Sequence, residues 1–178
     1  MIWLEDVHSL LAFAVANDLD VIQMDVNSAF LQATLEEEVY IRQPEGFIYP
    51  DRPHAVYQLR KSLYGLRQAP RMWNKEMHKY LILIGFERIS ANPCVYVKEA
   101  EKGIVIIGLY VNNNLIIGNR ELIQWTQKML ASCFPMKDLG PAKSFLGMEC
   151  IIVKERGEIL LRQSGFIRDI LKQYRLDD

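Results

Sequence analysis

The stretch from Gly103 to Gly118 constrains the fold of this chain more than any other part of the sequence. It reads GIVIIGLYVNNNLIIG, in which two apolar runs are separated by three asparagines. Apolar, β-branched runs with turn-prone residues between them are typical of buried strands joined by a tight turn. The segment therefore predicts a hairpin. It leaves open whether Asn112, Asn113 and Asn114 serve only the turn or occupy a place where chemistry needs other residues.

Further helices and strands are predicted on both sides of this hairpin. Helical spacing of apolar residues predicts helices over residues 4–15, 67–84, 121–132 and 164–175. Runs rich in β-formers predict single strands over 19–24, 39–43, 55–59 and 114–118. Two hairpins are predicted, one over 94–111 with its turn at 101–103 and one over 143–162 with its turn at 156–157. Residues 26–35 are predicted to form a loop or a short helix. This order predicts an α+β fold, an antiparallel sheet with helices packed on one face, in a single domain covering residues 1–178.

Composition excludes several classes of protein. A formal net charge of -1 does not favour a free-standing nucleic-acid binder, because such proteins gain most of their affinity from a basic surface. Cys94, Cys133 and Cys150 are odd in number and lack CxxC spacing, so neither a disulfide framework nor a zinc site is predicted. The N-terminus does not resemble a signal peptide, and no apolar run approaches the roughly 18 residues of a membrane span. We expect a soluble intracellular protein, cytoplasmic or nuclear, that is neither secreted nor membrane-bound.

Three segments together resemble the reverse-transcriptase domain of copia-type LTR retrotransposons. They are MDVNSAFLQATLEEEVYIRQPEGF (24–47), LYGLRQAPRMWN (63–74) and LYVNNNLIIG (109–118), and MKDLG (136–140) and FLGMEC (145–150) follow in the expected order. The resemblance covers nearly the whole chain and implies a polymerase-palm-like antiparallel sheet that lacks most of the fingers. A full domain of this family starts upstream of Met1 and continues downstream into RNase H, so the resemblance implies truncation at the N-terminus.

Polymerases of this family transfer nucleotides with two magnesium ions held by carboxylates. The resemblance places Asp25 at the first metal-binding aspartate, with the backbone carbonyl of Val26 as a further ligand. Without the resemblance, the simpler interpretation is that Asp25 caps the segment that starts at Val26. The family expects Tyr-Val-Asp-Asp at the tip of the central hairpin, where this sequence has Tyr110, Val111, Asn112 and Asn113. We therefore expect magnesium binding to be weak or absent and the polymerase to be inactive or severely impaired.

The resemblance also implies residues that contact nucleotide and nucleic acid. Phe30 corresponds to the aromatic residue that excludes ribonucleotides, although a phenylalanine here is also compatible with a core position. Gly65, Arg67 and Gln68 are expected near the incoming nucleotide or the template. Further basic residues expected to bind nucleic acid are Arg60, Lys61, Arg71 and Lys75. A solvated basic helix face is the alternative for this part of the chain.

The partners that the resemblance implies are an RNA or DNA template-primer and a deoxynucleoside triphosphate, both bound weakly here. An alternative function is a non-enzymatic domain kept as a weak platform for nucleic acid or protein. Absence of the fingers would expose apolar surface or an unpaired strand edge, so a homodimer is one further expectation, as is association with missing fingers or RNase H segments.

Overall fold

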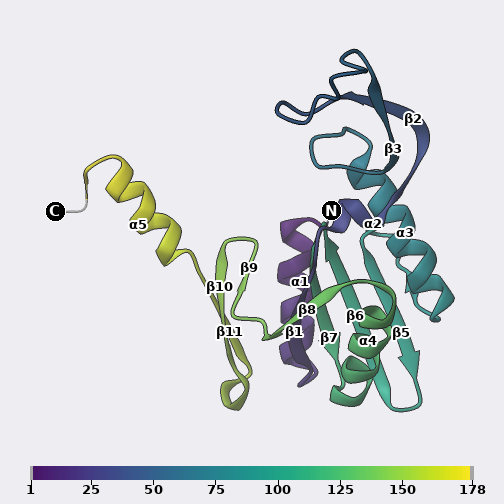
Figure 1. The fold of residues 1–178 in the computed structure, drawn as a ribbon. Helices are drawn as coiled ribbons and strands as arrows, with labels where there is room; N and C mark the ends of the chain where they lie inside the picture. Colours follow the sequence, from purple (N-terminus) through teal and green to yellow (C-terminus); the bar gives the residue numbers. More distant parts are fainter. Residues whose placement is uncertain (1, 177–178) are drawn as a thin grey trace.

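The computed structural model describes residues 2–176. Figure 1 shows a central sheet flanked by helices, with a strand pair projecting at one end and a helix extending away at another. The helices are α1 (Leu4–Ala16), α2 (Ala29–Gln32), α3 (Ala69–Leu83), α4 (Arg120–Cys133) and α5 (Ser164–Gln173). The strands are β1 (Asp20–Val26), β2 (Thr34–Arg42), β3 (Val56–Lys61), β4 (Glu87–Arg88), β5 (Val95–Ala100), β6 (Gly103–Tyr110), β7 (Asn113–Gly118), β8 (Met136–Pro141), β9 (Ser144–Phe145), β10 (Met148–Val153) and β11 (Glu158–Arg162), with a short 3-10 turn over Lys154–Arg156.

Six strands form the main sheet in the order β4-β5-β6-β7-β1-β8, and their pairings are antiparallel. The strand pair β2-β3 and the three-stranded sheet β11-β10-β9 are separate from it. The central strand β7 is buried on both faces, because Leu115, Ile116 and Ile117 alternate in direction and are all 0% exposed. The predicted α+β class with an antiparallel sheet is confirmed.

Side-chain contacts show which helices cover which face of the sheet. On one face, Nδ1 of His78 in α3 lies 3.0 Å from the hydroxyl of Tyr96 in β5. Tyr80 of α3 donates a 2.5 Å hydrogen bond to the carbonyl of Met129, so α4 lies beside α3 on that face, as expected. The other face carries Gly108, whose missing side chain leaves room for Ile2, and Leu10 of α1 lies next to the same position. Helix α1 therefore adds cover to the second face.

The main difference from the sequence prediction is strand β8. It pairs with β1 at the edge of the main sheet, with a break in register between Gln23 and Met24. Its sequence, MKDLGP, contains two charged residues, a glycine with a φ of +71° and a proline, and is mostly exposed. An edge strand has only one partner and little buried surface, so it carries no apolar pattern from which it could be predicted.

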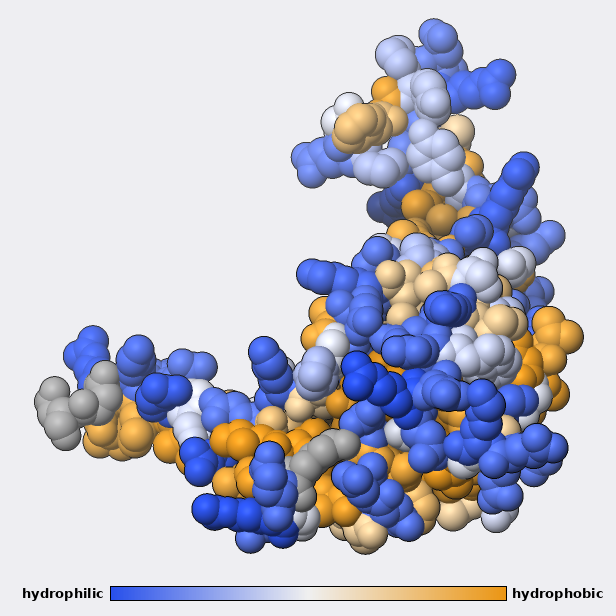
Figure 2. Space-filling view, turned by 90° about the horizontal axis from the view of Figure 1, so that it is seen from below, coloured by the Kyte–Doolittle hydropathy of each residue, from blue (hydrophilic) through white to orange (hydrophobic). Residues whose placement is uncertain are grey.

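Apolar surface is exposed on the arm formed by the β10-β11 hairpin and α5. None of the residues Ser164–Gln173 of α5 is buried, and Phe166, Ile167 and Ile170 are all exposed. Figure 2 shows orange apolar atoms along this arm and at its base. The expected homodimer stays a prediction. No helix within residues 2–176 is long and apolar enough to cross a membrane.

Candidate active site

The tip of the β6-β7 hairpin is a turn with Val111 and Asn112 as its two central residues, because Tyr110 pairs with Asn113. Val111 has a φ of +54°, in a region that β-branched residues rarely adopt. Two hydrogen bonds hold this strained turn. Trp73 of α3 donates its indole N–H to the Val111 carbonyl at 2.6 Å, and the Val26 N–H donates to the Asn112 carbonyl at 2.8 Å.

Asp25 lies beside this tip. It is paired with Asn113 in the β1-β7 register, and Nδ2 of Asn112 donates a hydrogen bond to its Oδ1 at 2.5 Å. Asp25 lies inside β1, and the N-cap of the following helix α2 is Ser28, so the interpretation of Asp25 as a helix cap is wrong. The structure thus brings Asp25 together with Asn112 and Asn113, although Asp25 lies 87 residues before Asn112 in the sequence.

Gln23 extends this set of polar side chains and was not singled out by its sequence. It is 9% exposed, and its Nε2 donates to Oδ1 of Asn113 at 3.0 Å. Nδ2 of Asn113 in turn lies 3.5 Å from Oδ1 of Asn112. Gln23, Asn113, Asn112 and Asp25 form a chain of amide contacts that ends on one carboxylate. Only the alternation of β1, which places Gln23 and Asp25 on the same face, could have indicated this role.

The donor set at this tip does not match a two-magnesium centre. Magnesium prefers carboxylate oxygens and phosphate oxygens, and the tip offers a single carboxylate that already accepts a hydrogen bond from an amide. Among residues 2–176, no group of three or more His, Cys, Asp or Glu side chains could hold a metal ion. The backbone of Val26, expected to supply a carbonyl ligand, follows Asp25 at the end of β1.

Asn114 differs from its two neighbours. It pairs with Leu109 and Met24 in the two adjacent strands and faces the side of the sheet covered by α3. The side chain is 0% exposed, and neither its amide nitrogen nor its amide oxygen has a hydrogen-bond partner within the described chain. The three asparagines therefore do not act together: Asn112 and Asn113 belong to the polar tip, and Asn114 is a buried polar residue in the core.

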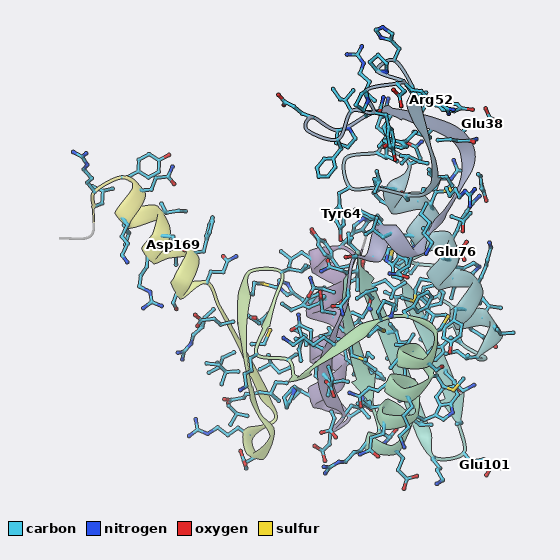
Figure 3. The ribbon with its side chains drawn as sticks, viewed as in Figure 1. Glu38, Arg52, Tyr64, Glu76, Glu101 and Asp169 are labelled. Atoms are coloured by element: carbon cyan, nitrogen blue, oxygen red, sulfur yellow. The ribbon has the colours of Figure 1, made fainter. Side chains whose placement is uncertain are left out.

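The residues expected at the nucleotide site lie around the start of α3. Phe30 is buried in α2, and its ring centroid is 4.7 Å from that of Tyr64. Figure 3 shows Tyr64 between the sheet and the projecting β2-β3 pair. Gly65 has a φ of +91°, which favours glycine, while Arg67 is exposed and Gln68 is the N-cap residue of α3. Their roles in nucleotide binding stay predictions.

The basic residues are divided between α3 and β3. Arg67 and Arg71 are exposed near the start of α3, and Arg60 and Lys61 are exposed on β3. Lys75, by contrast, forms a 2.6 Å salt bridge with Glu36 of β2. The hydrogen bond and the charge of Lys75 lower the pKa of Glu36. This ion pair fastens the projecting strand pair to α3 and leaves Lys75 less available than the two arginines.

A cleft of about 470 Å³ with both polar and apolar walls adjoins the hairpin tip on the face that carries Asn113. Gln23, Tyr110 and Asn113 line one side, and Leu146, Gly147 and Glu149 of the β9-β10 turn line the other. The FLGMEC segment, singled out in the sequence, thus lies opposite the tip, since β9 and β10 are joined at Leu146 and Gly147. The site consists of a floor from β1, β6 and β7 and a wall from the β9-β10 turn.

Comparison with known proteins shows the family to which this sequence is related. Residues 1–178 match the family described as reverse transcriptase (RNA-dependent DNA polymerase). The chain is 38% identical over 172 residues to the retrovirus-related Pol polyprotein from transposon TNT 1-94 of Nicotiana tabacum, a match that covers 96% of this chain and 13% of that protein. It is 41% identical over 166 residues to the Pol polyprotein from transposon RE1 of Arabidopsis thaliana, covering 93% of this chain and 11% of that protein. It therefore spans a small part of these relatives.

Proposed function

Since this chain belongs to the reverse transcriptase family of copia-like retrotransposon Pol polyproteins, we propose that it is a polymerase palm whose nucleotidyl-transfer activity is lost or severely reduced. The observation that carries the proposal is the hydrogen bond from the Asn112 amide to Asp25, at the place where the family has further carboxylates. Asn112 and Asn113 keep the shape of the expected aspartates but not their charge. The proposal includes an intracellular location, cytoplasmic or nuclear.

The size of the electrostatic loss supports inactivity. Two unit charges about 4 Å apart interact by about 4 kcal/mol at an effective dielectric of about 20, and a divalent ion roughly doubles that energy. Loss of two carboxylates therefore removes several kcal/mol of affinity for magnesium. Each loss of about 1.4 kcal/mol from the transition state slows a reaction tenfold. One carboxylate at the tip is too few for efficient two-metal catalysis.

The remaining roles follow the family. In this proposal Phe30 limits the space beside the sugar, and Gly65, Arg67 and Gln68 lie against the incoming nucleotide. Template-primer RNA or DNA and deoxynucleoside triphosphate are the partners, and both bind weakly. Tyr64 supports this arrangement, because its contact with Phe30 fixes the ring at the junction of α2 and the β3-α3 connection.

A primer-extension assay tests the proposal. The unchanged protein and the double variant Asn112→Asp plus Asn113→Asp are compared on a primed RNA template with magnesium or manganese. We expect no measurable extension by the unchanged protein. Robust extension by it would refute the proposal whatever the double variant does. Isothermal titration with magnesium is run in parallel, and tight binding by the unchanged protein would count equally against it.

A second candidate, a weak nucleic-acid-binding platform, is favoured by the arrangement of cations on α3. Arg67, Arg71, Lys75 and Lys79 recur at four-residue intervals and so form one column along the helix and its N-cap region. Glu36 pairs with Lys75 and Glu76 pairs with Lys79 at 3.2 Å, so this candidate depends mainly on the exposed Arg67 and Arg71. Filter binding at two salt concentrations tests this candidate, because a phosphate-driven interaction must weaken steeply as salt rises. Binding that does not change with salt would exclude it.

A further inference from the structure

A second cleft, of about 280 Å³, lies between α3 and the end of strand β6. Its walls include Phe30, Arg71, Trp73, Asn74, Leu109 and Val111. These residues come from α2, α3 and the β6-β7 hairpin, and Pro93 and Cys94 of the turn that precedes β5 complete the lining, so four segments distant in the sequence converge on one small space. The hairpin tip is part of its wall through Val111.

This cleft lies on the other side of the sheet from the polar side chains around Asp25, although it shares Phe30 with the proposed nucleotide site. Leu109 pairs with Asn114 across the β6-β7 ladder, and both side chains face α3. Tyr110 and Asn113 are the next pair, and their side chains face the opposite side of the sheet, with Asp25 paired to Asn113. The cleft therefore lies behind the hairpin, and the polar site lies in front of it.

The lining of the cleft is mainly apolar and has polar groups on one side. The rings of Phe30 and Trp73 and the side chains of Leu109 and Val111 provide apolar walls. The exposed guanidinium of Arg71 provides a positive charge, and the Asn74 amide nitrogen lies 3.8 Å from Cys94 Sγ, a weak acceptor. The charge of Arg71 contributes to the lowered pKa of Glu36, but the carboxylate of Glu36 accepts its hydrogen bonds from Lys75.

From this lining we infer that the cleft binds a small aromatic carboxylate. The ring system would lie between the apolar walls, and the carboxylate would accept hydrogen bonds from Arg71 and from the Asn74 amide, which a sulfur atom satisfies poorly. Arginine matches a carboxylate well because its planar fork of donors can bond both oxygens. The chemical class of the ligand thus follows from one cation and a weakly bonded amide at the edge of an aromatic pocket.

The volume of the cleft sets the size of the ring system. An apolar cavity of about 150 Å³ is enough to hold benzene, so about 280 Å³ accommodates two fused rings. A ligand of this size in a partly open cleft binds with a dissociation constant on the order of 0.1–1 mM. This inference goes beyond the proposed function, and it can be tested without any polymerase activity.

Trp73 gives a direct way to test binding, because its ring lines the cleft and its N–H bonds the Val111 carbonyl. The test uses a background with Trp3→Phe and Trp125→Phe, so that Trp73 is the remaining tryptophan. The probe is 2-naphthoate, whose uncharged analogue is 2-naphthamide. We expect saturable quenching of Trp73 fluorescence by 2-naphthoate and at least fivefold weaker binding of the amide.

Three further variants test whether the probe occupies this cleft. Arg71→Gln should weaken 2-naphthoate binding at least fivefold, whereas the matched variant Arg52→Gln, on the distant tip of the β2-β3 projection in Figure 3, should not change it. Asn74→Phe fills the cleft and should abolish saturable quenching. Circular dichroism confirms that each variant is folded. Linear, unsaturable quenching, or equal affinity in the Arg71→Gln and Arg52→Gln variants, would overturn the inference.

Discussion

The amide nitrogen of Asn112 lies 2.5 Å from Oδ1 of Asp25 and donates a hydrogen bond to it. An aspartate at position 112 would instead bring a second carboxylate against the first, an arrangement that needs a cation or a shared proton. The asparagine removes this repulsion and replaces it with an attractive contact. The tip of the hairpin can therefore stay closed against β1 in the absence of metal.

The first prediction concerns metal-dependent stability. In metal-free buffer, Asn112→Asp plus Asn113→Asp should destabilise the protein by about 1–3 kcal/mol, because three carboxylates then face one another. For a domain of this size the melting temperature should fall by roughly 2–4 °C per kcal/mol. Millimolar magnesium should reverse the loss, since a ligand that binds only the folded state stabilises it. Differential scanning fluorimetry with and without magnesium measures both effects.

A charge-matched variant provides the control for this prediction. Asp25→Asn plus Asn112→Asp keeps one carboxylate and one amide but exchanges their positions. Its melting temperature should not respond to magnesium, and the unchanged protein should not respond either. A magnesium response of equal size in all three proteins would show that the effect arises elsewhere on the surface.

A second prediction concerns Asn114, whose buried amide atoms lack hydrogen-bond partners within residues 2–176. Burying a polar group without a partner costs about 1–3 kcal/mol. Asn114→Leu should therefore stabilise the protein by about that amount, measured as a higher urea midpoint with an unchanged slope. Asn113→Leu is the comparison, and it should not stabilise, because it breaks the bond with Gln23. Destabilisation by Asn114→Leu would show that the amide is satisfied in solution.

The sequence was sufficient to predict the hairpin over residues 103–118 and the helices, because their apolar patterns are long and regular. The family motifs assigned Asp25, Asn112 and Asn113 to one site, and the three residues lie together at the hairpin tip, while their role in catalysis stays a prediction. Two features were not predictable. Gln23 acquires its role only from strand register, and Asn114 is separated from its neighbours only by the alternation of β7. Both depend on pairing between distant strands, which periodicity within one segment does not reveal.

A third prediction concerns Trp73, whose indole N–H donates to the carbonyl of the strained residue Val111. Trp73→Phe keeps an aromatic ring against Phe134 but leaves this carbonyl without its donor. We expect a loss of about 1–3 kcal/mol and faster hydrogen exchange at the hairpin tip. Trp125→Phe is the matched control, since Trp125 stacks on Phe86 and lies beside Lys98, which pairs with Val105 at the end of β6 remote from the tip, so it should not change exchange at the tip. Equal exchange in both variants would contradict the prediction.

The last prediction concerns pH and Tyr96, which is 0% exposed in β5. Burial raises the pKa of Tyr96 to about 12, from an ordinary value of 10.0. The folded state therefore holds the phenol neutral, whereas the unfolded chain ionises it above about pH 10, so stability falls as pH rises through this interval. Two pKa units correspond to about 2–3 kcal/mol.

Urea unfolding from pH 9 to 11.5 tests this prediction. The free energy of unfolding should fall more steeply with pH for the unchanged protein than for Tyr96→Phe. The exposed Tyr174 is the comparison, because Tyr174→Phe changes a side chain that is not buried and should leave the slope unchanged. A Tyr96→Phe variant with the slope of the unchanged protein would mean that Tyr96 ionises without unfolding the sheet.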